Sequence, residues 1–312
     1  MTSPTTVVTM FFDMKNRPDA TERTRPKSFY LDKGRQTLKL NFPMVVFCDN
    51  STFEDVKYIR NTLVSNAKEI TTYIIKPFEA YDFYKYSLPI IESNRALSKT
   101  YIKSKNTPSS VIIYMFKIHT LFLAKQLNPY NTPFYAWLDF GGSHIMRGFD
   151  IYAPKMLENP NPKISFCYIH YRSPSELASV KTPFNNGECG VAGGAFTAAA
   201  EYVDQFYTGM MSIYYEMLSH KIGHGDEQVM THFYNRYPES CTIYYGDYYS
   251  ILSNYHTIRE DYTTVKNFFI HMALAKGRKD VAVAAANAVL ASVKNNTLQL
   301  SPAEINYLKT IL

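Results

Sequence analysis

An apolar run that ends at a carboxylate and two glycines is the stretch of this sequence best suited to chemistry. Residues 133–144 read PFYAWLDFGGSH, and Trp137, the only tryptophan, precedes Asp139 by two positions. Because so apolar a run lacks alternation, we expect a strand buried on both faces, as in a parallel sheet. That strand would deliver Asp139 to the sheet edge, where Gly141 and Gly142 would let a ligand or ion approach the main chain. The alternative is that Asp139 only braces a turn.

Two further acids close predicted strands near the beginning of the sequence. Residues 5–14 (TTVVTMFFDM) include Asp13, and residues 44–49 (MVVFCD) end at Asp49. A helix that starts after Thr52 precedes a third predicted strand, TTYIIK. This order predicts parallel β-α-β units, in which the two acids share one edge of the sheet.

Helices are predicted for two long apolar segments. Residues 109–127 follow Pro108 and stop before Asn128-Pro129, which predicts a buried helix leading into the Asp139 strand. Residues 196–218 begin with alanines and continue with aromatic residues and methionines at helical spacing. The polar residues 15–35 are predicted to form a loop.

The second half of the sequence places another pair of acids at a helix start. Asp226 and Glu227 open a predicted helix, where the helix dipole favours negative charge. Strands are predicted at 163–171 and 242–247, and helices follow to the end, the last at the capping signal SPAE. We therefore expect an α/β domain over residues 1–256, with a mostly parallel sheet flanked by helices, and a helical extension over 257–312.

Composition narrows the function classes. The 312 residues carry a net charge of +6 but no dense basic tract, so a nucleic-acid partner is not predicted. The 4 cysteines form no C-x-x-C pair, which favours reduced thiols and a cytoplasmic location. No run of 18 apolar residues occurs, so we expect a soluble protein, with peripheral membrane association as an alternative. Dinucleotide, Walker A, zinc-protease and serine-hydrolase signatures are absent.

Four segments in a fixed order carry a resemblance to a known family. They read WLDFGGSH, GECGVAGGAFTAAAEYVDQF, GDEQVMTHFYNRYPE and YYGDYYSILSNYH. In this order they resemble the HtrL/YibB-like family of glycosyltransferases and, more loosely, nucleotide-diphospho-sugar transferases of the GT-A fold. The resemblance covers residues 7–256 and implies a GT-A-like, Rossmann-type sheet with a UDP- or GDP-sugar donor and a glycan or glycoconjugate acceptor.

The resemblance also implies a divalent cation. A D-x-D strand end holds Mn²⁺ or Mg²⁺ on the donor diphosphate, and such oxygen ligands suit these ions. Here the segment is Asp139-Phe140-Gly141, so the second acid is missing. Asp139 would then hold the ion with water and phosphate oxygens alone, or His256 would complete the site. The alternative for His256 is a surface residue without a ligand.

The remaining site residues follow from the same resemblance. Gly193 and Gly194 would pass under the donor sugar or acceptor, or would only make a tight turn. Asp226 and Glu227 would supply the base of an inverting enzyme, would orient a substrate in a retaining one, or would only cap a helix. Asp13, Asp49 and Trp137 are predicted to contact the donor nucleotide.

A second function class is consistent with the same residues. A catalytically inactive relative of the GT-A enzymes would bind carbohydrate or support an assembly, with the C-terminal helices as its docking surface. The single acid in the DFG segment is the feature that favours this alternative. Detectable hydrolysis of a sugar nucleotide would argue against it.

Overall fold

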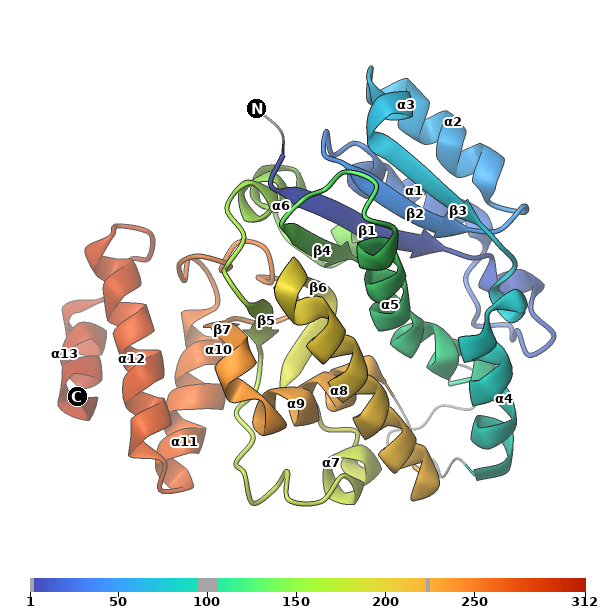
Figure 1. Ribbon diagram of the computed structural model, residues 1–312. Coiled ribbons are helices and arrows are strands. Elements are labelled where there is room, and N and C mark those ends of the chain that lie inside the picture. Colours follow the sequence, from blue (N-terminus) through green and yellow to red (C-terminus); the bar gives the residue numbers. More distant parts are fainter. Residues whose placement is uncertain (1–2, 95–105, 223–224) are drawn as a thin grey trace.

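The fold is built on one mixed sheet whose strands mostly run in the same direction. The computed structural model describes residues 3–94, 106–222 and 225–312 (Figure 1). Its 7-stranded sheet has the order β3-β2-β1-β4-β6-β5-β7. The strands are β1 Thr5–Phe11, β2 Met44–Cys48, β3 Thr71–Ile75, β4 Phe134–Leu138, β5 Ile164–Tyr168, β6 Val191–Ala199 and β7 Cys241–Tyr245.

Strand β6 runs against its neighbours. It is antiparallel to β4 and β5, whereas β1 is parallel to β2 and β4, β2 to β3, and β5 to β7. The first residues of β6 therefore lie at the same edge as the carboxyl ends of the other strands. This edge is where ligands bind in open α/β sheets.

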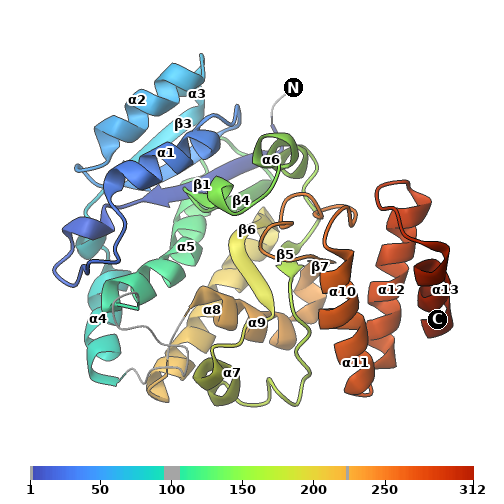
Figure 2. The ribbon, with the colours of Figure 1, turned by 180° about the vertical axis from the view of Figure 1, so that it is seen from behind.

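Helices cover both faces of the sheet and each face has its own core. One core lies beneath α5 (Pro108–Leu127) and α8 (Ala200–Ser219) and contains Val8, Trp137 and Phe196. The other lies beneath α1 (Lys27–Leu38), α2 (Phe53–Leu63) and α6 (Phe149–Glu158) and contains Val7, Val46 and Leu138. Figure 2 shows the face that α1 and α6 cover. The helices before the C-terminal layer are α1 Lys27–Leu38, α2 Phe53–Leu63, α3 Ala67–Ile70, α4 Asp82–Asn94, α5 Pro108–Leu127, α6 Phe149–Glu158, α7 Lys181–Asn186, α8 Ala200–Ser219 and α9 Asp226–Arg236.

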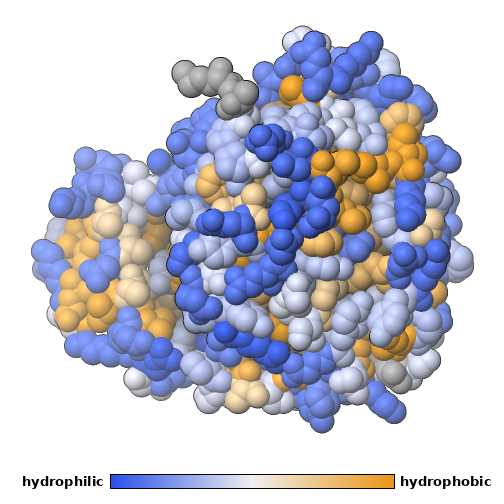
Figure 3. Space-filling model, viewed as in Figure 1, coloured by the Kyte–Doolittle hydropathy of each residue, from blue (hydrophilic) through white to orange (hydrophobic). Residues whose placement is uncertain are grey.

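The C-terminal helices form a layer beside β7. They are α10 Tyr262–Val265, α11 Met272–Ala275, α12 Lys279–Lys294 and α13 Pro302–Ile311, with a π-helical turn at Lys266–His271. The Phe269 ring packs against Tyr168 and Tyr245 at 5.2 and 5.0 Å, so this layer shares the core of the α/β part. Apolar side chains also gather on its surface (Figure 3). The boundary between residues 256 and 257 stays a prediction.

The predicted fold class is confirmed, and two segments differ from their predictions. Residues 15–35 are not all loop, because α1 begins at Lys27; that helix buries only Gly34, Thr37 and Leu38, which leaves little apolar pattern to detect. Residues 191–199 form β6, so the predicted helix begins at Ala200 rather than Phe196. The alanines of this segment favour a helix by themselves. Hydrogen bonding to β4 on one side and to β5 on the other overrides that preference.

Candidate active site

The reversed strand β6 brings its glycines beside Asp139. Leu138 pairs with Ala195, and the next amide, that of Asp139, donates a 2.9 Å hydrogen bond to the Gly194 carbonyl. Asp226 and Glu227 begin α9, which packs on β6 at the same position. The structure thus gathers Asp139, the glycine pair and the acid pair at one edge of the sheet.

A lysine that the sequence reasoning missed holds the three segments together. Lys117 projects from the middle of α5, and its ammonium lies 3.3 Å from Asp139 Oδ1 and 2.9 Å from Asp226 Oδ2, and donates to the Gly193 carbonyl at 2.9 Å. The side chain is only 6% exposed. The ammonium thus makes hydrogen bonds to Asp139 and Gly193 and an ion pair with Asp226. A lysine in so apolar a helix was the available signal, because a buried charge requires partners.

The charges around Lys117 keep it protonated. Burial lowers the pKa of Lys117, but the carboxylates of Asp139 and Asp226 outweigh that effect and hold the pKa above its ordinary value. For Asp139, burial raises the pKa by more than the Lys117 ammonium lowers it, so the pKa stays above its ordinary value. Lys117 is therefore a fixed positive charge beneath the carboxylates.

Asp139 presents one occupied and one open oxygen. Its Oδ1 accepts from Lys117 and, at 2.7 Å, from Trp137 Nε1, while Oδ2 has no hydrogen-bond donor within the described ranges. The side chain is 43% exposed, whereas Trp137 is only 1% exposed. Trp137 therefore orients Asp139 from the protein interior through this hydrogen bond. Its indole is too deeply buried for the predicted contact with the donor.

The two acids of α9 have different environments. Asp226 is 5% exposed and paired with Lys117. Glu227 accepts from the Gly193 amide at 3.0 Å and from the Tyr248 hydroxyl at 2.7 Å. Burial and the neighbouring Asp226 raise the pKa of Glu227 to about 7. Glu227 is thus the acid that can exchange a proton near neutral pH.

The glycines of β6 make room for protein groups. A Cβ on Gly193 would overlap Asp226 Oδ2 and stand 3.2 Å from the Glu227 Cγ. A Cβ on Gly194 would meet the Met146 methyl at 2.8 Å and stand 3.7 Å from Asp139 Oδ2. The space beside Gly193 is therefore filled by carboxylates rather than left for a substrate, and the predicted substrate contacts of both glycines stay predictions.

Gly193→Ala should displace Asp226 and destabilise the protein by about 1–3 kcal/mol, the usual cost of overpacking. Gly141→Ala is the matched control, because a Cβ there meets its nearest atoms at 3.4–3.9 Å, ordinary contact distances. Urea unfolding of both variants provides the measurement. Equal stability of Gly193→Ala and the wild-type protein would contradict this account of the glycine.

His256 does not lie beside Asp139. Its Nε2 is 3.5 Å from the carbonyl of Lys155, and its ring packs on Tyr255 at 4.7 Å. Lys155 lies in α6, whose Leu157 carbonyl accepts from Thr5 at the beginning of β1. His256 is therefore near the amino ends of the parallel strands, and the two predicted metal ligands are not brought together.

The side chains at this site can ligate a cation only together with a substrate. Within the described residues, no group of three or more His, Cys, Asp or Glu side chains is placed to hold a metal ion. The open Asp139 Oδ2 remains, and Mg²⁺ is commonly held by one or two carboxylates together with substrate phosphates and water. The site thus suits a cation that arrives with a diphosphate, and not one caged by the protein alone.

Asp13 and Asp49 lie at the carboxyl ends of β1 and β2, as predicted from the sequence. Asp13 accepts from the Lys15 amide at 3.0 Å and from Asn16 Nδ2 at 2.7 Å. Asp49 accepts from the Ser51 amide at 3.0 Å and pairs with Arg17 at 3.5 Å. Both carboxylates are engaged locally, and their contact with a nucleotide stays a prediction.

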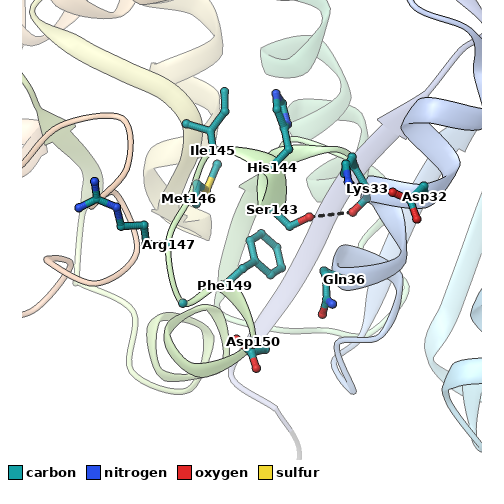
Figure 4. Close-up of a pocket in the computed structure, with 11 residues that line it drawn as sticks. Asp32, Lys33, Gln36, Ser143, His144, Ile145, Met146, Arg147, Phe149 and Asp150 are labelled. Atoms are coloured by element: carbon teal, nitrogen blue, oxygen red, sulfur yellow. Dashed lines mark hydrogen bonds and ion pairs between the residues drawn. The ribbon is translucent and has the colours of Figure 1, made fainter.

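A cavity of about 550 Å³ lies beside this edge, between α1 and the segment that follows β4 (Figure 4). Lys33 and Gln36 line it from α1, and its opposite wall includes Ser143, whose hydroxyl donates to the Lys33 carbonyl at 2.8 Å. Met146 also lines the cavity, and its methyl reaches Gly142 and Gly194. The cavity and the carboxylate cluster therefore share one wall.

Several solved structures resemble this one. Mouse xyloside xylosyltransferase 1, apo form, aligns at 14% identity over 76% of this chain and 83% of its own, with a TM-score of 0.42. The 4-diphosphocytidyl-2C-methyl-D-erythritol synthase of Anaerococcus prevotii aligns at 8% identity over 79% and 88%, with a TM-score of 0.37. A CMP:2-keto-3-deoxy-manno-octonic acid synthetase complexed with CTP aligns at 9% identity over 78% and 90%, with a TM-score of 0.37.

Sequence comparison adds a family. No curated protein matches the chain. A family model described as "Bacterial protein of unknown function (HtrL_YibB)" matches residues 3–257. The resemblance drawn from the four motifs is confirmed as to family, and the transferase activity attached to it stays a prediction, because the description names no function.

Proposed function

The chain belongs to the HtrL_YibB family, and from the site it carries we propose a glycosyltransferase that moves a sugar from a UDP- or GDP-sugar to a hydroxyl of a glycan or glycoconjugate. One observation carries the proposal. Asp139 has an open oxygen, the pKa of Glu227 is raised to about 7, and the two acids are hydrogen-bonded to the adjacent residues Gly194 and Gly193, respectively, at the same edge. A strand-tip carboxylate and a base are the two groups that the reaction requires.

Glu227 is the proposed general base. The acceptor hydroxyl would attack the anomeric carbon as its proton passes to a Glu227 carboxylate oxygen, and the bond from that carbon to the diphosphate breaks with its electron pair on the leaving oxygen. Tyr248 orients Glu227 through the 2.7 Å hydrogen bond. Asp226, locked against Lys117, is a positioning residue rather than the base. This assignment suits an inverting reaction.

Asp139 is the proposed ligand of a divalent cation, Mn²⁺ or Mg²⁺. Such an ion supplies positive charge to the leaving diphosphate. Lys117 and Trp137 hold Oδ1, so Oδ2 is left facing the open edge. Because a single carboxylate binds such ions weakly, we expect the cation and the nucleotide to bind together.

Binding experiments test the nucleotide. Isothermal titration with UDP, GDP and their sugars, with and without Mn²⁺, should show binding that the metal strengthens. No binding of any nucleotide would refute the proposal. Binding without transfer or hydrolysis would favour the inactive carbohydrate-binding relative instead.

The transfer rate should rise with pH through about 7, because Glu227 is active as a base only when deprotonated. The Tyr248 hydroxyl lowers the pKa of Glu227, so Tyr248→Phe should move the rise to higher pH. Tyr249→Phe is the control, since Tyr249 makes no bond to Glu227. A pH–rate profile that is the same in both variants and the wild-type protein would contradict the role of Glu227.

A further inference from the structure

The missing second acid has a replacement on the α1 side of the site. A Cβ on Gly141 would point toward α1 and meet Tyr30 Cδ1 at 3.4 Å and Lys33 Cβ at 3.7 Å. A side chain at this position would therefore start toward the phenol ring of Tyr30. Where a D-x-D segment would add a carboxylate, this chain has the aromatic ring of Tyr30 instead.

Arg25, just before α1, brings a positive charge to the same place. Its guanidinium lies over the Phe29 ring at 4.5 Å and has no carboxylate within 4.0 Å in the described part of the chain. By contrast, the guanidinium groups of Arg17, Arg147 and Arg172 are each paired with acids. The charge of Arg25 is thus exposed and available to an anion.

The segment after Asp139 helps to hold this guanidinium. His144 Nδ1 lies 2.5 Å from the Gly141 carbonyl, so this nitrogen carries the hydrogen and donates it. The other ring nitrogen, Nε2, is left to accept from Arg25 at 3.5 Å. The Gly142 amide in turn donates to the Asp139 carbonyl at 2.8 Å. One short turn therefore links Arg25 to the proposed cation ligand.

The Tyr30 hydroxyl lies within the influence of both charges. Burial raises the pKa of Tyr30, Arg25 lowers it and Asp139 raises it. The Tyr30 ring packs edge-on against Phe29 at 5.4 Å, and Phe29 carries the Arg25 guanidinium on its face, so the phenol lies beside that group and beside Gly141. The carboxylate alone would repel a diphosphate, so a cation on the opposite side would favour binding.

We propose that Arg25, assisted by Tyr30, binds the diphosphate of the donor directly, on the side of Asp139 where the second acid is absent. A planar guanidinium can donate two parallel hydrogen bonds to phosphate oxygens. Stacking on Phe29 and the contact with His144 orient the group beforehand. The inference rests on the proposed function, since the donor supplies the diphosphate.

Titration of three probes separates the contact with the anion from the contact with the nucleoside. The full chain would be titrated with inorganic pyrophosphate, UDP and uridine, each with and without Mg²⁺. Arg25→Ala should weaken pyrophosphate and UDP by at least about tenfold, a loss of about 1.4 kcal/mol. Uridine binding should not change. Arg25→Lys should restore only part of the loss, because an ammonium lacks the paired donors.

Arg23→Ala is the matched control, because Arg23 lies two residues earlier, is exposed and has the same charge. It should bind all three probes as the wild-type protein does. Equal losses of affinity in both arginine variants would show that Arg25 attracts the anion only by its charge, without a specific contact. Unchanged binding in Arg25→Ala would overturn the assignment.

The probes also distinguish this inference from the proposed function. Binding of pyrophosphate that depends on Arg25, together with no binding of UDP here and none of GDP in the nucleotide titration above, would keep the anion site and refute the nucleotide donor. If UDP binds no more tightly than uridine, and Arg25→Ala binds both as the wild-type protein does, the Arg25 contact is refuted while nucleotide binding remains. No binding of any of these probes, and none of GDP in the nucleotide titration, would refute both.

Discussion

Replacing Lys117 by methionine is expected to lower the free energy of unfolding by about 3–5 kcal/mol, the usual cost of removing one partner from a buried ion pair. Asp226 would remain as a carboxylate that is 5% exposed and has lost its counter-charge, and the Gly193 carbonyl would lose its 2.9 Å hydrogen bond. Because methionine keeps the length and apolar character of the lysine stem, the loss would report the charge. Urea unfolding followed by circular dichroism gives the measurement.

Two controls isolate the cause of that loss. Lys125→Met removes a lysine from the same helix, but its 2.7 Å pair with Asp204 lies at the surface, where such pairs contribute about 0–1 kcal/mol. Adding Asp226→Asn to Lys117→Met removes both buried charges and should recover part of the stability. If Lys117→Met has the same free energy of unfolding as Lys125→Met, the pairing of Lys117 with Asp226 and Asp139 does not stabilise the fold.

Asp139→Asn is expected to reduce sugar transfer by at least about a hundredfold, in the range seen when a group that stabilises transition-state charge is removed. The amide oxygen can still accept from Trp137 and Lys117, whose hydrogen bonds end on Oδ1. The open side would then carry an amide nitrogen, which cannot ligate a cation. The test compares transfer rates and Mn²⁺-dependent nucleotide binding in variant and wild-type protein.

Glu158→Gln is the control for this substitution, because Glu158 is an exposed acid at the end of α6, the helix that follows the same strand, and does not line the cavity. It should transfer sugar at the wild-type rate. An unchanged melting temperature for Asp139→Asn would assign its loss to chemistry rather than unfolding. Full activity with undiminished metal dependence would remove Asp139 from the mechanism.

The sequence by itself determined most of the elements and the acids at their ends. The strand before Asp139 and the helix before it were predictable because runs of apolar residues between proline, asparagine and glycine are local signals. The same holds for the capping box of Ser301 and Glu304 and for the acids that open α9. Each depends on residues within a few positions of one another.

The tertiary structure alone decided which of these residues meet. The insertion of β6 against the direction of its neighbours places Gly194 beside Asp139, and Lys117, which pairs with Asp139, lies 22 residues before it in the sequence. The same packing takes His256 to α6, where it contacts Lys155 rather than Asp139. Strand order and the pairing of buried charges are set by contacts between distant segments, whose free energies depend on how the whole sheet is covered. No spacing in the sequence encodes them.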